Sequence, residues 1–143
     1  MDLTTEKKRI GCPSLFAAIA KAQPQLHCFG HVHNGWGAKV VAWRPQISDH
    51  PSHFSDIDNG KSVVIDSLTK LNSTIFDSPD DEAKRQMEID RYRRQRCRDI
   101  ISQYQSSAIG PGRTLFVNAA VKGDESLDQL PWVAEIDLPS NIA

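Results

Sequence analysis

The sequence predicts an α/β fold, and three observations support this class. Five short, largely apolar segments have the character of strands, at residues 26–29, 39–43, 62–66, 114–118 and 132–138. An amphipathic helix is predicted over 13–23, because Leu15, Phe16 and Ile19 recur at helical spacing. A second, long and charged helix is predicted over 79–104. Functional sites in layered α/β folds are built at strand ends.

Prolines and polar caps set the ends of both helices. Pro13 is acceptable at the first helical position, and Pro24 moves the residue before it out of the helical region. The long helix has Ser78 as a cap, Pro79 at its first position and acidic residues in its first turn. Its segment 91–98 is polar nearly all round, so we expect this helix to lie on the surface or to project from it.

The strands differ in how clearly they are marked. Segment 114–118 is the clearest, by its β-branched and aromatic content. Apolar side chains on both faces of 26–29 favour an inner strand over an edge strand. Residues 44–78 are rich in proline, aspartate and serine, which indicates an inserted loop that contains one short strand at 62–66. Pro139 ends the final strand.

Composition limits the classes of protein. The 143 residues suggest one domain at most, and the net charge of −1 gives no field that favours nucleic acid or an acidic membrane. Three cysteines without paired spacing, at 12, 28 and 97, indicate a reducing compartment. No apolar run approaches the roughly 20 residues of a membrane helix, and no secretory signal begins the chain. We therefore expect a soluble cytoplasmic protein with no membrane partner.

The segment Gly30-His31-Val32-His33 follows the first predicted strand directly. In an extended segment, residues two apart point to the same side, which would place both imidazoles together. Neutral imidazole is a common ligand of zinc, iron and manganese ions. The short pattern leaves two interpretations open: a metal site, or two polar histidines without a ligand.

A family resemblance bears on this choice. The segments 11–15 and 24–37, which include Gly30-His31-Val32-His33-Asn34-Gly35, resemble the C-terminal part of calcineurin-like metallophosphoesterases. They are most similar to a branch of small metallophosphoesterase-domain proteins common in fungi and animals. Segments 114–120 and 130–139 also resemble that branch. The chain, 1–143, would thus be a partial domain with family-like segments 10–43 and 113–139, and with the basic helix inside an insertion at 44–112.

The resemblance implies a fold and a chemistry. The implied fold is the C-terminal portion of a four-layer α/β/β/α sandwich. The implied activity is hydrolysis of phosphomonoesters or phosphodiesters, with two divalent metal ions of the Mn, Fe or Zn type as cofactors. Such ions lie roughly 3.5–4 Å apart and activate a bridging water. Carried over by position, His31 would bind the second metal and His33 the first, and the partner would be a small phosphate ester.

The chain departs from the family in its other ligands. These lie upstream in the family, in Asp-x-His, Gly-Asp and Gly-Asn-His-Glu patterns and one further histidine, and none of these patterns precedes His31. A two-metal site needs about four to six ligands per ion, including a bridging carboxylate. We expect a C-terminal fragment, such as a truncated gene model gives, that is inactive alone; the alternative is a non-catalytic metal-binding remnant or interaction module. Half of the family's sandwich would leave faces and edges of its sheets uncovered, so we expect marginal stability and self-association of the chain.

We expect structural rather than catalytic roles for the other candidate residues. Asn118 is expected to cap the turn after its strand rather than to bind a metal, and Cys28 to be a small core residue. The stretch 91–98 is expected to be a solvated helix with alternating charge rather than a nucleic-acid site. The three remaining histidines match no family motif: His27, His50 and His53.

Overall fold

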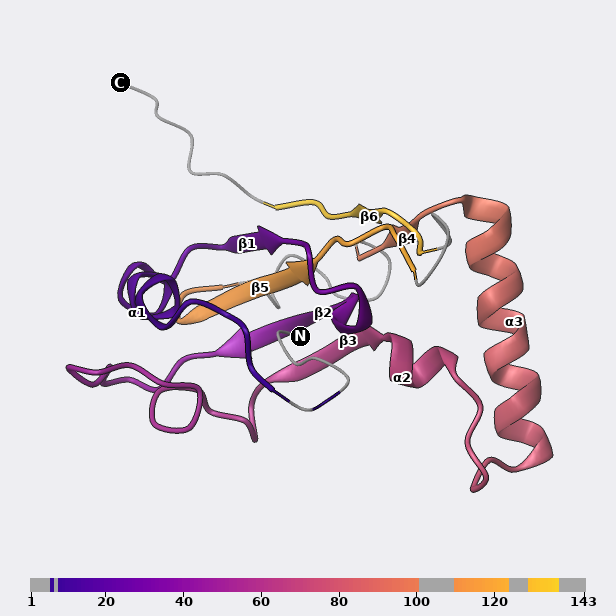
Figure 1. Ribbon diagram of the computed structural model, residues 1–143, viewed down its shortest axis with the longest axis horizontal. Coiled ribbons are helices and arrows are strands. Elements are labelled where there is room, and N and C mark those ends of the chain that lie inside the picture. Colours follow the sequence, from indigo (N-terminus) through magenta and orange to yellow (C-terminus); the bar gives the residue numbers. More distant parts are fainter. Residues whose placement is uncertain (1–5, 7, 101–109, 124–128, 137–143) are drawn as a thin grey trace.

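The computed structural model describes residues 6, 8–100, 110–123 and 129–136. Its centre is a four-stranded sheet with strand order β1-β5-β2-β3 (Figure 1). The strands are β1 (Leu26–Phe29), β2 (Gly37–Ala42), β3 (Val63–Ser67) and β5 (Arg113–Asn118). The described residues add three α-helices to this sheet, which confirms the α/β class predicted from the sequence.

The connection from β1 to β2 crosses over the end of β5. Strand β1 pairs with β5 in parallel and places Phe29 opposite Asn118. Strand β2 pairs with the other side of β5 in antiparallel fashion and places Gly37 opposite the same Asn118. Residues 30–36 therefore span the carboxyl end of β5, and Asn118 lies beneath them.

Apolar side chains cover both faces of this sheet. Alternate residues of a strand point to opposite faces, so Val40 and Val41 enter different clusters. One cluster packs Val40 with Leu115 and Val117. The other packs Val41 and Trp43 against helix α1, Pro13–Ala22. The predicted helix at 13–23 is confirmed, and its end is marked by Gln23 in the left-handed region with a φ of 44°.

The prediction that 26–29 is an inner strand is wrong for the described part of the chain. There, β1 pairs only with β5 and forms one outer edge of the sheet, while β3 forms the other. Strand β5 comes from more than eighty residues further along the chain and lies between β1 and β2, and no described strand pairs with the other side of β1. Cys28 consequently lies exposed rather than in the core, which corrects its expected role as a packed residue.

Helix α3, Pro79–Gln95, stands at one end of the molecule (Figure 1). The predicted serine cap is confirmed: Ser78 Oγ accepts from the Asp81 amide, and the Asp81 carboxylate accepts from the Ser78 amide. The helix ends well before residue 104, because Arg96 adopts a φ of 56°. The chain then enters strand β4, Arg98–Asp99, and residues 101–104 lie outside the described part.

The final strand is shorter than predicted. Strand β6 covers only Trp132–Val133, residues 134–136 are not strand, and 137–138 lie outside the described residues. Among the described residues, it pairs in parallel with β4 and not with the main sheet. The segment 44–112 supplies β3, the short helix α2 (Leu68–Leu71) and α3, so the predicted insertion takes part in the main sheet.

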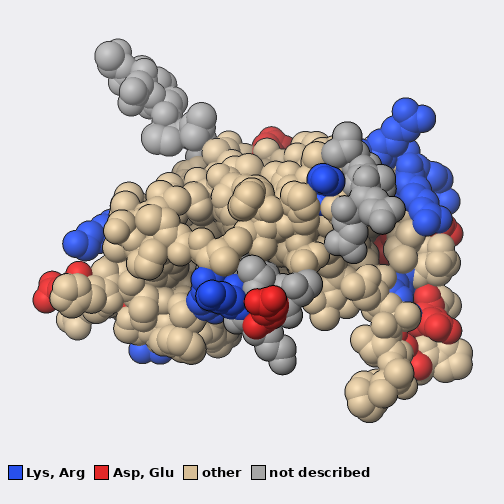
Figure 2. Space-filling model, in the orientation of Figure 1, with Lys and Arg blue, Asp and Glu red and all other residues tan. Residues whose placement is uncertain are grey.

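Charge is distributed unevenly over the surface. Lysine and arginine side chains gather over the carboxyl end of α3, whereas acidic side chains lie nearer its start (Figure 2). This polarity suits the helix dipole, which favours anions at the amino end and cations at the carboxyl end. Among the described residues, none of the helices has the length and the apolar composition that crossing a membrane requires.

Gly37 begins β2 at a position that has no room for a side chain. Its φ is 151°, and an added Cβ would lie 2.5 Å from the backbone oxygen of Asp66 on the neighbouring strand. We expect Gly37→Ala to lower the free energy of unfolding by about 1–3 kcal/mol, measured by urea denaturation. Gly60→Ala is the matched control, because its Cβ would make only an ordinary contact with Asp58. Equal stability of the two variants would contradict the prediction.

Candidate functional site

The histidine corner, residues 30–36, is the segment that crosses over β5. It begins with a γ-turn centred on His31, which has a φ of 72°, and the Val32 amide donates to the Gly30 carbonyl at 2.9 Å. Histidine enters the left-handed region more readily than most residues, yet the turn still stores strain. The surroundings must therefore hold this conformation in place.

The corner is not extended, which corrects the geometry assumed from the sequence. After the γ-turn, residues His33–Gly35 form a single 3-10 turn, and the Trp36 amide donates to the His33 carbonyl at 3.2 Å. The alternation rule for extended chains does not apply to such a segment. His31 is exposed and His33 is half-buried, so the two imidazoles lie in different surroundings.

Two amide side chains from distant segments hold the backbone of the corner. Asn118 is fully buried at the end of β5, where its Nδ2 donates to the Val32 carbonyl at 2.8 Å. Its Oδ1 accepts from the Ala120 amide at 3.1 Å, which confirms the predicted turn cap. Gln129 Nε2 donates to the His33 carbonyl at 3.1 Å. The backbone carbonyls beside both imidazoles are thus tied to the protein.

Trp36 fixes the far end of the corner. The side chain is buried, and its Nε1 donates to the Leu130 carbonyl at 2.9 Å. Its ring stacks on Trp132 with centroids 4.7 Å apart and an interplanar angle of 29°. The segment 129–132 therefore packs along the corner as a support. This arrangement fixes the backbone through contacts that do not occupy the imidazole nitrogens.

His27 has a packing role on β1. Its ring lies 5.3 Å from Phe29 and 5.2 Å from Phe116, measured between centroids. Burial lowers the pKa of His27 below its usual 6.5, so its imidazole is largely neutral at pH 7. Both observations agree with the prediction that this histidine belongs to the strand and not to the site.

The histidine corner supplies two imidazoles but not a complete metal site. Within the described residues, no group of three histidine, cysteine, aspartate or glutamate side chains is placed to hold a metal ion. His50 and His53 lie in the loop after β2, where the ring of His53 packs 4.0 Å from that of Phe54. The residues described here therefore do not fit two ions in a catalytic geometry by themselves.

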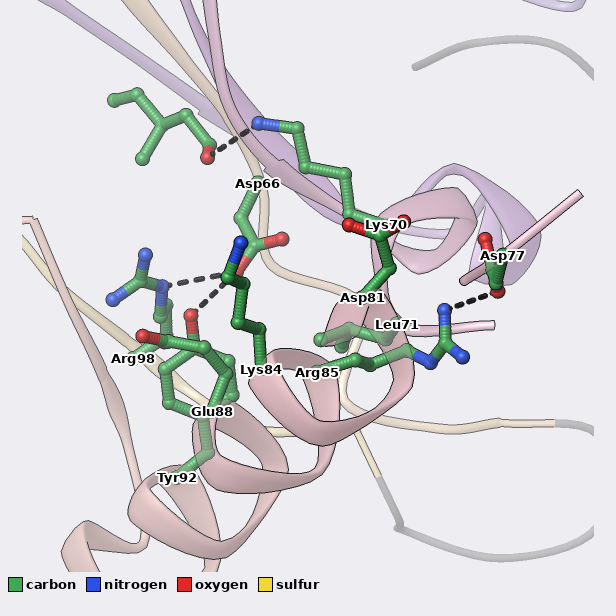
Figure 3. A pocket seen from close by; sticks show the side chains of 11 residues that line it. Asp66, Lys70, Leu71, Asp77, Asp81, Lys84, Arg85, Glu88, Tyr92 and Arg98 are labelled. Carbon is green, nitrogen blue, oxygen red and sulfur yellow. Dashed lines mark hydrogen bonds and ion pairs between the residues drawn. The ribbon is translucent and has the colours of Figure 1, made fainter. Parts of the chain in front are cut away.

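A cleft of about 450 Å³ lies beside α2 and α3 (Figure 3). It is lined by equal numbers of acidic and basic side chains: Asp66, Asp77, Asp81, Glu88, Lys70, Lys84, Arg85 and Arg98. Two ion pairs form inside it, Arg85 with Asp77 and Arg98 with Asp66. A lining that is neutral overall, with half of its charged side chains paired within it, indicates a joint between elements rather than a ligand site.

Asp66 is the centre of this joint and was not predicted from the sequence. Its Oδ2 accepts from Tyr92 Oη at 2.9 Å and from Arg98 Nε at 3.0 Å (Figure 3). Burial, followed by the neighbouring carboxylate, raises the pKa of Tyr92 and keeps its hydroxyl protonated. The Arg98 guanidinium also lies 4.5 Å from the centre of the Tyr92 ring. The sequence signal that could have identified Asp66 is its place as an acidic residue at the end of an apolar strand.

Comparison of the chain with protein-family models, with curated proteins and with solved structures finds no match. The class that the fold defines is therefore a small mixed α/β protein. The feature most suited to ligand chemistry is the histidine corner, which combines a strained turn with exposed imidazole.

Proposed function

We propose that this chain contributes part of a two-metal phosphoesterase site, with His31 and His33 as one ligand for each ion. The strained turn at His31, held by Asn118 and Gln129, is the observation that carries the proposal. Strained backbone persists only where its surroundings fix it, and it is concentrated at functional sites. A corner built only to connect two strands has no need of such a turn.

The position of the corner supports the same proposal. The carboxyl ends of the parallel strands β1 and β5 meet at this corner, which is where α/β folds build their sites. Neutral imidazole suits manganese, iron and zinc ions, and a pair of such ions binds the oxygens of a phosphate ester. The remaining ligands, including a bridging carboxylate, have to come from outside the described residues.

A non-catalytic metal-binding or interaction module is the second candidate function. The observation that favours it is the lack of a third ligand beside His31 and His33 among the described residues. Two imidazoles hold a transition metal weakly and leave most of its coordination positions to water. The two candidates share the same metal-binding corner and differ in whether hydrolysis occurs there.

Metal binding at the corner is the first test. Manganese ions added to the chain should broaden the imidazole NMR signals of His31 and His33, because the ion is paramagnetic and binds beside them. We expect His31→Ala or His33→Ala to weaken zinc binding, measured by calorimetry, by about tenfold or more. His50→Ala is the matched control, since His50 is exposed on another loop. Equal broadening of His50 and the corner histidines would contradict the proposal.

An activity assay separates the two candidates. The chain is incubated with manganese or zinc and an aryl phosphate ester, first alone and then with candidate partner chains. Turnover that is lost in His31→Ala establishes the phosphoesterase and rejects the non-catalytic module. Asn118→Ala should lower metal affinity although both imidazoles are intact, because it releases the Val32 carbonyl. Metal binding without turnover under all conditions favours the module.

A further inference from the structure

The segment 129–133, which we call the brace, contacts the histidine corner. Its Leu130 carbonyl accepts a hydrogen bond from Trp36 Nε1 at 2.9 Å, and its Trp132 ring stacks on the Trp36 ring with centroids 4.7 Å apart. At the start of the brace, Gln129 Nε2 donates to a backbone carbonyl of the corner at 3.1 Å. These contacts fix both ends of the 3-10 turn that carries the second imidazole.

The brace also contacts strand β4. The Arg98 amide donates to the Pro131 carbonyl at 2.8 Å, and the Ile100 amide donates to the Val133 carbonyl at 3.0 Å. These bonds pair β4 with β6, which is part of the brace, near the carboxyl end of α3 (Figure 1). Because the brace bonds to β4 and to the corner, a displacement of β4 would also displace the contacts that hold Trp36.

Two kinds of contact hold β4 against the rest of the protein. Ile100, directly after β4, is buried in the apolar cluster that contains Leu115. Apolar contact is not directional, so it permits small sliding movements. The Arg98 side chain is 3% exposed, and its Nε donates to Asp66 Oδ2 at 3.0 Å, beside the Tyr92 hydroxyl that donates to the same oxygen (Figure 3). Such directional bonds define one position for β4.

The burial of this ion pair also favours a positioning role. A buried ion pair adds little stability over an apolar pair of the same size, because both charges lose their hydration. Its best-attested use in proteins is to specify one arrangement among several that packing alone permits. The pair joins β3 to β4, so the arrangement that it specifies is the place of β4 and, through β4, the place of the brace.

We propose that Asp66 and Arg98 are positioning residues for the histidine corner. The pair fixes β4, β4 fixes the brace, and the brace holds the backbone beside His33. Neither residue is assigned as a metal ligand; each acts by limiting where the imidazoles lie, since ligands must be held closely for tight binding. This role rests on the proposed function, because the binding that it serves is that of metal at His31 and His33.

The first test is Arg98→Lys, which keeps a positive charge beside Asp66 but replaces a planar fork by a single ammonium group. The NMR signal of the Trp36 indole N–H should shift or broaden, because the brace is then held less firmly. Zinc affinity, measured by calorimetry, should fall about three- to thirtyfold. Asp56→Asn is the matched control: it weakens buried hydrogen bonds in the serine-rich loop after β2, and should change neither readout. Circular dichroism and urea denaturation verify that both variants fold and compare their stability.

A second variant tests whether Arg98 acts through the brace. Trp132→Leu removes the ring that stacks on Trp36, so it should weaken zinc binding by a similar factor. Adding Arg98→Lys to this variant should then cause little further loss, because the route from the ion pair to the corner is already broken. Losses of zinc affinity that add fully would overturn the route through the brace.

Two results of the first test would contradict the proposal. An unchanged Trp36 signal in folded Arg98→Lys means that the ion pair does not position the corner. An equal fall in zinc affinity in Asp56→Asn means that affinity only follows overall stability. If the wild-type chain binds no zinc, the proposed function fails, whereas the Trp36 signal, recorded without metal, still shows whether the ion pair holds the corner.

Discussion

Replacing Asp66 by asparagine is expected to lower the free energy of unfolding by about 3–5 kcal/mol. Asp66 and Arg98 are only 4% and 3% exposed, and the carboxylate accepts from the guanidinium at 3.0 Å. The amide would remove the negative charge opposite a buried positive charge, which cannot regain its hydration without opening the joint. The same change weakens the hydrogen bond from Tyr92. Urea denaturation, with the midpoint and slope fitted together, measures the loss.

Two further variants test whether the loss of stability in Asp66→Asn arises because its ion pair is buried. Asp90→Asn removes the carboxylate of an exposed pair with Arg93, 3.9 Å long and with side chains 47% and 75% exposed, so it should change stability by less than about 0.5 kcal/mol. Replacing both buried partners, in Asp66→Asn with Arg98→Met, should recover much of the loss, since the buried positive charge that faces Asp66 is removed as well. A loss below about 1 kcal/mol for Asp66→Asn alone would mean that water reaches the pair.

Asp56→Ala is expected to cost about 3–4 kcal/mol, the second largest effect. This carboxylate is fully buried in the loop after β2 and accepts four hydrogen bonds from three serines. The Ser48 and Ser52 amides donate to it at 2.6 and 2.7 Å. Alanine would leave these partly buried donors without their acceptor. Asp49→Ala, at an exposed position in the same loop, is the control and should be nearly neutral.

The contribution of Asp56 should also depend on pH. Burial alone would raise its pKa, but hydrogen bonds from Ser55, Ser48 and Ser52 outweigh burial and lower the pKa to about 2, from 3.8. The folded state therefore favours the charged form. Its stabilisation is complete above about pH 4 and is lost as the pH falls toward 2. The stability difference between wild type and Asp56→Asn, measured from pH 6 to pH 2, should shrink over that range; a constant difference would contradict the assignment.

Local structure could be predicted from the sequence where local chemistry determines it. Pro13 and Pro24 set the ends of α1, and the serine cap before Pro79 sets the start of α3. The segment 114–118 formed its strand because its β-branched and aromatic side chains suit a covered sheet. The order of the strands could not be predicted, since β5 pairs with two strands that lie far away along the chain.

The candidate site was predictable only in part, for the same physical reason. The glycine and histidine pattern identified His31 and His33, but not the γ-turn that places His31. The side chains that hold the corner, Asn118 and Gln129, follow it by more than eighty residues. Likewise, Arg98 belongs to a stretch that is polar in sequence, and only the approach of Asp66 in space buries it.

The crossing of residues 30–36 over β5 also constrains how the chain folds. Strands β1 and β2 are joined by seven residues, yet they do not pair with each other, because a third strand separates them by roughly 10 Å. Until residues 113–118 arrive, they form an open frame without hydrogen bonds across it. Closing this frame requires ordering a loop of some seventy residues, which is entropically costly and slow. We therefore expect the two imidazoles to reach their final positions late in folding, when β5 docks and Asn118 donates to the Val32 carbonyl.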